Sequence, residues 1–415
     1  MNVRRLGPWL LFALLTGSAP AQDAPPLPPA PVPVPAESPL PPTSIVIEPA
    51  GPEPSPKTNE ELPAVKALWR YGDGGEYLLW YIKNSRVPAL VVGTPGGAVT
   101  GGNGGASPVH GLPDGRVLFG DTGVDMEDRS GGLFTLSMPL NEEKTIGFHG
   151  TYFFLGTRSV SFVGGGDGGP DSPTVGRPYV DALTGAGALR TVAAPGVADG
   201  VIHVALTSRL QGVEANGVGN VVGGEHYQID LLSGFRFLQL AEGLEVLEKE
   251  QYLAGAGPLL AGTTFAGEDR ISANTRFYGG QVGTRLEFRR AGAFMNFTGK
   301  LGFGDSVEVV RFSGTSITSG PDGRTVVGTG NLFSTRGNVG RYTHESFALL
   351  PELDLRVGYE MNEQARFFVG YTLLYLSDVV RPGDQIDGTL GTPPGGASRP
   401  LPLVRATDFW AQGLT

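Results

Sequence analysis

The chain has 415 residues, a formal net charge of −10, 17% charged residues and no cysteine. The acidic balance argues against a nucleic-acid partner, because no basic surface can dominate, and the lack of cysteine excludes disulfides, thiolate nucleophiles, zinc fingers and iron–sulfur clusters. With 40% hydrophobic residues and 65 glycines, the sequence is too apolar for a disordered chain and less charged than a usual soluble enzyme.

Residues 1–21 have the pattern of an export signal. Arg4 and Arg5 precede an apolar stretch over Leu6–Leu15, and Ala19-Pro20-Ala21 offers a small-residue cleavage site before Gln22. The alternative is a short membrane anchor, but the stretch is shorter than the about 20 apolar residues that span a bilayer. No later apolar run reaches that length, so we expect a periplasmic, secreted or outer-membrane protein.

Residues 22–68 are rich in proline and precede the first strand pattern. Proline fixes φ and cannot donate a backbone hydrogen bond, so we expect an extended or disordered linker. A disordered leader is the simplest interpretation of this composition, and a spacer that touches peptidoglycan is the functional alternative.

Residues 69–415 alternate apolar and polar side chains with a period of two, which predicts β-strands. In Tyr278–Arg289, for example, Tyr278, Val282 and Phe288 lie on one face and Arg285 and Glu287 on the other. Similar patterns occur around 146–154, 227–237, 296–303, 349–359 and 366–375. Several of these stretches reach the about 9–11 residues that a tilted transmembrane strand needs.

The expected connections alternate in length. Short polar turns are predicted at 141–144, 241–243, 290–292 and 360–364, and long glycine-rich loops at about 157–225, 253–270, 305–345 and 377–406. Short turns at one end and long loops at the other are typical of bacterial outer-membrane barrels. We count about ten strands, from Glu76–Ile82 to Phe409–Leu414, with up to two more hidden in the loops. An even number places both termini at the short-turn end.

The predicted fold is all-β: a transmembrane antiparallel up-and-down β-barrel of about 10–12 strands. Unpaired backbone groups in hydrocarbon each cost several kcal/mol, so a membrane sheet has to close on itself. The apolar face of each strand would then contact lipid, and the polar face would line the interior. The residues that we expect to face the interior are charged: Arg236, Arg285, Glu287, Arg289, Lys300, Glu352, Asp354, Arg356 and Arg366.

Five sequence blocks, in order, resemble a known family: Glu76–Tyr81 with Pro88–Val91, Leu232–Leu238, Arg276–Gly283, Val369–Asp387 and Asp408–Gly413. The chain from about Trp69 onward is similar to the putative beta-barrel porin-7 family of planctomycetes. The resemblance implies an outer-membrane barrel without an assigned solute. Members of this family continue past Gln412-Gly413 to a terminal aromatic residue that the barrel-assembly machinery is expected to recognise. Here the closing strand is expected to be short, through truncation or through closure with fewer hydrogen bonds.

Motifs for catalysis or cofactor binding are not visible. The five histidines are dispersed, and neither a nucleophile elbow nor a phosphate loop occurs. We therefore expect no enzyme activity, no catalytic or metal site and no cofactor.

The leading interpretation is an outer-membrane barrel that acts as a porin or passive channel of unknown solute and meets outer-membrane lipid and the barrel-assembly machinery. About ten strands would leave a narrow interior. The alternatives are a structural or adhesive envelope protein that acts through its long loops, and a secreted soluble β-sandwich.

Overall fold

The structure is a computed structural model that describes residues 74–94, 112, 115–253, 260–361 and 366–415. The chain divides into two units, Met1–Glu60 and Glu61–Thr415, and every described residue belongs to the second. The expected export signal and proline-rich linker lie outside the described residues. None of the described residues forms a helix long and apolar enough to cross a membrane.

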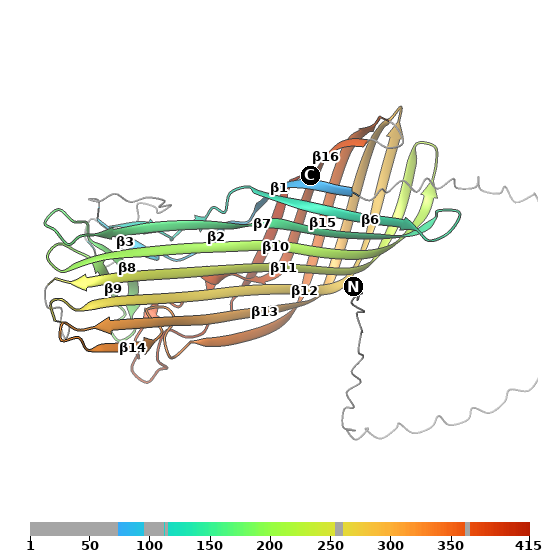
Figure 1. Cartoon of the computed structure of the whole chain (residues 1–415). Helices are drawn as coiled ribbons and strands as arrows, with labels where there is room; N and C mark the ends of the chain where they lie inside the picture. The colour runs from blue at the N-terminus through green and yellow to red at the C-terminus, as the bar shows by residue number, and fades with distance from the viewer. Residues whose placement is uncertain (1–73, 95–111, 113–114, 254–259, 362–365) are drawn as a thin grey trace, which may run out of the picture. The chain divides into compact units, whose positions relative to one another are not determined.

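Ten antiparallel strands close into a ring, in the order β1-β6-β7-β10-β11-β12-β13-β15-β16-β18 and back to β1 (Figure 1). Each strand pairs with its neighbours in chain order, which is the predicted up-and-down barrel. The ring strands are β1 Gly74–Ile82, β6 Arg129–Pro139, β7 Ile146–Gly166, β10 Ala198–Gly223, β11 Tyr227–Tyr252, β12 Thr264–Arg290, β13 Ala293–Ser319, β15 Gly340–Glu360, β16 Arg366–Val380 and β18 Ala406–Leu414.

The connections at one end of the ring are short. Residues 140–145, 224–226 and 291–292 join successive strands there. The predicted turn at 360–364 lies mostly outside the described residues. The β12–β13 turn needs only two residues, because Ala291 and Gly292 both adopt positive φ, 50° and 83°, which matches the twist of the flanking strands. The other connections are long, and the start of β1 and the end of β18 both lie at the short-turn end, as predicted.

The outer side of the ring carries an apolar band next to the short turns. On β12, outward residues from Tyr278 to Phe288 are mostly apolar, whereas those from Thr264 to Arg276 are mostly polar. The change occurs at the same level on adjacent strands, because Phe237 pairs with Tyr278, and Gln239 with Arg276. On β12 the band runs from Tyr278 to Phe288, which is about the length that a tilted strand needs to cross a bilayer. The ring is therefore a transmembrane barrel with apolar residues on its outer side.

The strands are much longer than predicted. β10 to β13 each span 26 or 27 residues, so more than half of each strand lies beyond the apolar band. The predicted turn at 241–243 is wrong, because these residues lie inside β11. The predicted loops at 157–225, 253–270 and 305–345 are also wrong over much of their length, because β7, β10, β12 and β13 occupy those residues. Outside lipid the outward side chains are polar, so the alternation that identified the strands is weak there.

Smaller elements fill the long-loop end. A second sheet contains β17, β8, β3 and β4, with β9 beside β8; β2 pairs with β5, and β14 extends the main sheet from β13. Their bounds are β2 Ser85–Arg86, β3 Val91–Gly93, β4 Arg116–Phe119, β5 Gly123–Val124, β8 Val175–Asp181, β9 Gly187–Ala193, β14 Thr325–Thr329, the 3-10 helix η1 Pro382–Gln385 and β17 Thr389–Leu390.

An apolar core joins the second sheet to the inner side of the long strands. Phe119 of β4 contacts Phe162 of β7 at a ring-centroid distance of 5.7 Å, and Val175 and Val192 are fully buried in the same cluster. The half of the barrel beyond the apolar band, with the connections that fill it, is called the extramembrane half below. It is a packed protein core, so the long loops do not leave an open vestibule among the described residues.

Candidate functional site: the charged interior

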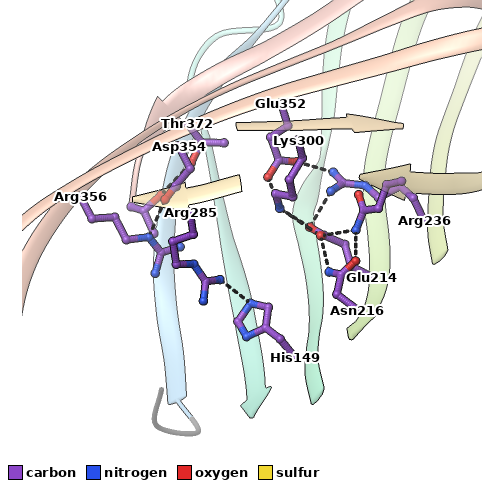
Figure 2. A network of polar contacts seen from close by, with 12 residues as sticks. His149, Glu214, Asn216, Arg236, Arg285, Lys300, Glu352, Asp354, Arg356 and Thr372 are labelled. Carbon is purple, nitrogen blue, oxygen red and sulfur yellow. Dashed lines mark hydrogen bonds and ion pairs between the residues drawn. The ribbon is translucent and has the colours of Figure 1, made fainter. Parts of the chain in front are cut away.

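Four charged side chains meet inside the membrane-spanning half (Figure 2). Arg236 Nη1 lies 2.5 Å from a carboxylate oxygen of Glu214, and Nη2 lies 2.5 Å from one of Glu352. Lys300 Nζ contacts the same two carboxylates at 2.8 and 2.6 Å. β11 carries Arg236 and β15 carries Glu352, with β12 and β13 between them in the ring. The cluster therefore crosses the interior and ties together strands that share no backbone hydrogen bonds.

Two amides complete the hydrogen bonding of this central cluster. Gln281 Nε2 donates to Glu214 at 2.8 Å and to Asn216 Oδ1 at 2.6 Å, and Asn216 Nδ2 donates to Glu214 at 3.2 Å. Glu214 thus accepts hydrogen bonds from four side chains. A buried ion cluster is stable only when its desolvated oxygens accept such hydrogen bonds, so the two amides stabilise this cluster.

A second cluster lies toward β1. Arg356 Nη1 lies 2.7 Å from Glu76 on β1, and its Nε donates to Asp354 at 2.9 Å. Thr372 donates its hydroxyl proton to the other oxygen of Asp354 at 2.8 Å. The Arg356 guanidinium also lies over the ring of Phe368, 5.3 Å from its centroid. These contacts join β15, β16 and β1 across the place where the ring closes.

The remaining predicted residues also make polar contacts. Arg285 on β12 contacts His149 Nε2 on β7 at 3.3 Å, again across the interior. Arg289 pairs with Glu287 on its own strand. Arg366 pairs with Glu360 at 2.5 Å and lies over the ring of Phe294, 4.5 Å from the centroid. Each of the nine residues predicted from the sequence makes at least one ion pair or hydrogen bond in the structure.

Strand parity explains why these side chains point inward. Along β12, Gln281, Arg285 and Glu287 are 8% exposed or less, while their alternating neighbours Val282 and Phe288 are 47% and 49% exposed. A strand projects successive side chains to opposite faces. One face of each strand meets lipid, so a shift of register by one residue would place charges in hydrocarbon.

An apolar layer closes the interior just beyond the central cluster. Leu238 follows Arg236 on the same face of β11, and it pairs with Phe277 of β12. Both residues are 1% exposed or less, as are Leu350 and Leu374. Trp80 and Phe153 continue the layer, with ring centroids 5.4 Å apart. A water-filled channel would leave the residues that line it solvated. These residues are buried, so the structure is a closed state at this level.

Several residues of the polar interior were not predicted from the sequence. Glu214, Asn216 and His149 were not among the predicted interior residues, although they are central to these contacts. Glu214 and Asn216 lie on β10, where the outward residues Ala215 and Gly217 are small. The apolar half of the alternation was therefore too weak to indicate a strand. The spacing of Glu214 and Asn216, two residues apart, is the one signal that could have indicated a polar face.

Metal-binding clusters were not predicted, and no group of three or more candidate ligands occurs in the parts of the chain that the structure describes. The charged side chains described above neutralise one another instead. The arrangement supplies cohesion across the interior, and it holds no cleft-exposed nucleophile or base in these contacts.

The chain is similar to one protein family and, distantly, to solved outer-membrane structures. Residues 74–415 match the family model described as Putative beta barrel porin-7. No curated protein matches the chain. The crystal structure of outer membrane protease OmpT from Escherichia coli covers 83% of this chain and 97% of its own, with 10% identity and a TM-score of 0.34. OmpT from Vibrio cholerae, an outer membrane protein in trimer form, covers 83% and 99%, with 7% identity and a TM-score of 0.10. These distant structural likenesses carry no argument about activity.

Proposed function

Because this chain belongs to the Putative beta barrel porin-7 family, we propose that it is an outer-membrane barrel, closed at rest, that acts in the cell envelope through its extramembrane half. This proposal favours the structural or adhesive role over a permanently open passive channel. The membrane-spanning half would be an anchor, and the extramembrane half would present a rigid protein surface to partners.

The observation that supports closure is the burial of the interior charges. Arg236 is fully buried, and Glu214 and Glu352 are 5% and 7% exposed. Porins with open pores are built from 16–18 strands, whereas a ring of ten leaves an interior that side chains can fill. Opening this interior would require the central cluster and the apolar layer beyond it to move together.

The outer membrane is the proposed location, because closed β-barrels cross that membrane and because the N-terminal sequence predicts export. Its lipids would contact the apolar band, and the barrel-assembly machinery would be needed for insertion. Membrane fractionation, combined with gel migration of heated and unheated samples, tests this part. Release into the soluble fraction without detergent would contradict it.

Planar-bilayer recording of the purified protein tests closure. We expect no steady conductance from the wild-type barrel at moderate voltage. A constant open conductance that appears with each insertion event would contradict a closed barrel and favour a passive channel.

A solute channel is the second candidate, and the charged interior favours it, since rings of charged side chains select ions in known channels. Conduction would then require displacement of the central cluster. The variant Arg236→Ala/Glu352→Ala discriminates between the candidates. If the barrel is a gated channel, removal of this pair should raise the frequency of conductance steps. If it is a closed anchor, the apolar layer should keep the variant silent.

We also propose that the barrel is not an enzyme. The support is that its interior carboxylates, cations and His149 contact one another, and that Arg236, Glu214 and Glu352 are buried. Assays of the purified barrel with peptide and phospholipid substrates test this, and turnover that copurifies with the folded barrel would contradict it.

A further inference from the structure

Arg129 is a deeply buried cation with few hydrogen bonds. It is the first residue of β6, and it is 2% exposed. Its Nη1 donates to the backbone carbonyl of Ser208 on β10 at 3.1 Å, across the inner side of β7. Its Nε and Nη2 are buried, and neither has a hydrogen-bond acceptor or an ion-pair partner among the described residues. A guanidinium stays charged and needs acceptors for its N–H groups, so this burial is costly unless a further acceptor binds.

Arg129 lies just beyond the apolar band, in the extramembrane half. Gln211 pairs with Gln239 where the outward residues become polar, and Ser208 pairs with Glu242 three residues further along both strands. The ladder between β10 and β7 is irregular directly after Ser208, whose carbonyl accepts from Arg129. Such irregularities often lie beside functional sites, because they redirect backbone and side-chain groups. A water-soluble ligand would therefore not have to cross the bilayer to reach Arg129.

The charges around Arg129 leave it without a counterion of its own. Burial lowers the pKa of Arg129 to about 10, while Glu242 opposes this fall and Arg381 adds to it. Both oxygens of Glu242 already accept hydrogen bonds from Arg381. Asp384 and Asp408 also act on Arg381, but they are not among the groups that act on Arg129. Two cations thus share one carboxylate here, and a bound anion would balance the charge.

The unpartnered edge of Arg129 has the geometry of an oxyanion site. Nε and Nη2 carry parallel N–H bonds along one edge of the guanidinium, and this edge matches two oxygens of one carboxylate or phosphate group. Arg381 uses the same two atoms to bind Glu242, with distances of 2.9 and 2.8 Å. The corresponding edge of Arg129 is similarly buried. It favours an oxyanion over a halide ion, which offers a single acceptor atom.

Two neighbouring side chains bring further polar atoms to the same level. Trp80 of β1 pairs directly with Arg129, so both side chains lie on the same face of the sheet. Trp80 Nε1 can only donate, and in the part of the chain that the structure describes it has no acceptor. The hydroxyl of Ser208 is buried in the same way. Three of these four unpartnered atoms can only donate, so the set suits a ligand that is rich in acceptors and not a cation.

We propose that Arg129, Ser208 and Trp80 form a binding site for a small oxyanion, either inorganic phosphate or a small carboxylate. Two oxygens of the ligand accept from Nε and Nη2 of Arg129, and Ser208 and Trp80 supply further donors. The ligand is small because all three side chains are 2% exposed or less. Its charge balances Arg129 beside the pair of Glu242 and Arg381, and it joins β1, β6 and β10 inside the ring. The site does not depend on whether the barrel conducts.

Binding of two radiolabelled probes to the full-length barrel in detergent tests the site. The denatured chain is refolded over a range of concentrations of phosphate in one arm and of acetate in the other, so that the probe can enter before the interior closes. Chloride keeps the ionic strength constant. We expect saturable binding of at least one probe, with a stoichiometry of one per chain, and no displacement by excess chloride. The arm that saturates identifies the class of oxyanion.

Arg129→Lys is the test variant, because it keeps the charge and removes the two-donor edge. We expect its affinity for the probe to fall at least about tenfold, since charge-assisted hydrogen bonds contribute that much to binding. Arg270→Lys is the matched control and should bind like the wild type, because Arg270 lies on the outer surface with its side chain 56% exposed. Gel migration of heated and unheated samples shows which variants have folded. If Arg129→Lys does not fold, Ser208→Ala replaces it, and its affinity should fall several-fold.

Three results would overturn the proposal. Lack of saturable binding in both arms would show that water satisfies Arg129. Undiminished binding by the folded test variant would place the ligand elsewhere in the barrel. An equal loss of affinity in Arg270→Lys would show that the probes respond to surface charge and not to this buried edge.

Discussion

Arg381 and Glu242 form a two-pronged ion pair inside the barrel. Nε of Arg381 donates to one carboxylate oxygen of Glu242 at 2.9 Å, and Nη2 donates to the other at 2.8 Å. Nη1 of the same guanidinium donates to the backbone carbonyls of Lys83 and Asn84 at 2.9 and 2.7 Å. Arg381 begins the β16–β18 connection, Glu242 lies on the inner face of β11, and the two carbonyls begin the β1–β6 connection. One side chain therefore fastens two long connections to the wall.

The residues after Arg381 continue this attachment. Gly383 passes so close to the chain that a Cβ there would lie 1.9 Å from the carbonyl oxygen of Arg86, so only glycine fits. Gln385 donates from Nε2 to the carbonyls of Arg381 and Arg405 at 3.0 and 2.8 Å. Part of the sequence block that carried the family resemblance thus folds into the barrel interior as an internal plug.

Removal of Arg381 should release this plug. In Arg381→Met, Glu242 would stay buried without the side chain that donates to both of its oxygens, and loss of one member of a buried ion pair costs about 3–5 kcal/mol. We expect the unfolding midpoint in urea to fall by a corresponding amount and the β16–β18 connection to become sensitive to protease.

The double variant Arg381→Met/Glu242→Leu is the control for this prediction. Replacement of a buried pair by apolar residues of similar volume is often neutral, so most of the lost stability should return. If the double variant is as unstable as the single variant, the packing of Arg381, and not its charge, holds the plug.

Arg236 should be the most sensitive residue of the central cluster. Arg236→Met leaves Glu214 and Glu352 with Lys300 as their shared cation, so we expect a loss of about 3–5 kcal/mol in the free energy of unfolding. Arg270→Met is a matched control, because Arg270 pairs with Glu245 and Glu268 on the outer surface and its side chain is 56% exposed. An exposed pair contributes at most about 1 kcal/mol. Similar losses in both variants, measured by urea unfolding in lipid vesicles, would contradict the role of the cluster.

The position of the membrane can be tested on one strand. Val282 and Ser272 both point outward from β12, one inside the apolar band and one beyond it. Val282→Arg should reduce stability in lipid vesicles by about 2–4 kcal/mol, whereas Ser272→Arg should change it little, because the cost of arginine depends on its depth in the bilayer. Equal effects of the two substitutions would mean that the band is placed wrongly.

The sequence predicted the membrane-spanning half well because lipid imposes a strong pattern there. Hydrocarbon on one side and charged side chains on the other make residues such as Phe288 and Glu287 alternate sharply. The closed all-β ring, the short-turn end and the polar contacts of Arg236 with its neighbours depend on that alternation.

The extramembrane half could not be predicted in the same way. Its strands have polar outward residues such as Ser272 and Arg276, and their inward residues form an apolar core with the loops. Such a strand resembles a glycine-rich loop in one dimension, which is why Glu242 appeared to lie in a turn. Contacts such as that of Arg381 with Glu242 join residues 139 positions apart, and strand periodicity contains no information about them.

Acidic and basic residues also meet in the extramembrane half, where β8 and β9 pack against β11 and β12. Arg190 Nη2 lies 3.5 Å from Glu250, and Tyr252 donates its hydroxyl proton to Glu250 at 3.1 Å. Glu248 lies beside them and contacts both Arg190 and the fully buried Arg177, which also pairs with Asp269. Burial raises the pKa of Glu250 from 4.5 to about 7, and Glu248 adds to this rise while Arg190 opposes it.

The raised pKa of Glu250 makes the attachment of β9 dependent on pH. The folded state binds a proton at Glu250 up to about pH 7, whereas the unfolded chain releases it near pH 4.5. Local stability should therefore fall as pH rises through this window, by on the order of 2 kcal/mol between about pH 5.5 and 8. Hydrogen exchange of the β9 amides, corrected for the intrinsic effect of pH, should show less protection at the higher pH. Glu250→Gln should remove the difference, and Glu245→Gln, on the outer face of the same strand, should retain it. A wild-type protection that does not change with pH would show that Glu250 stays ionised in the folded barrel.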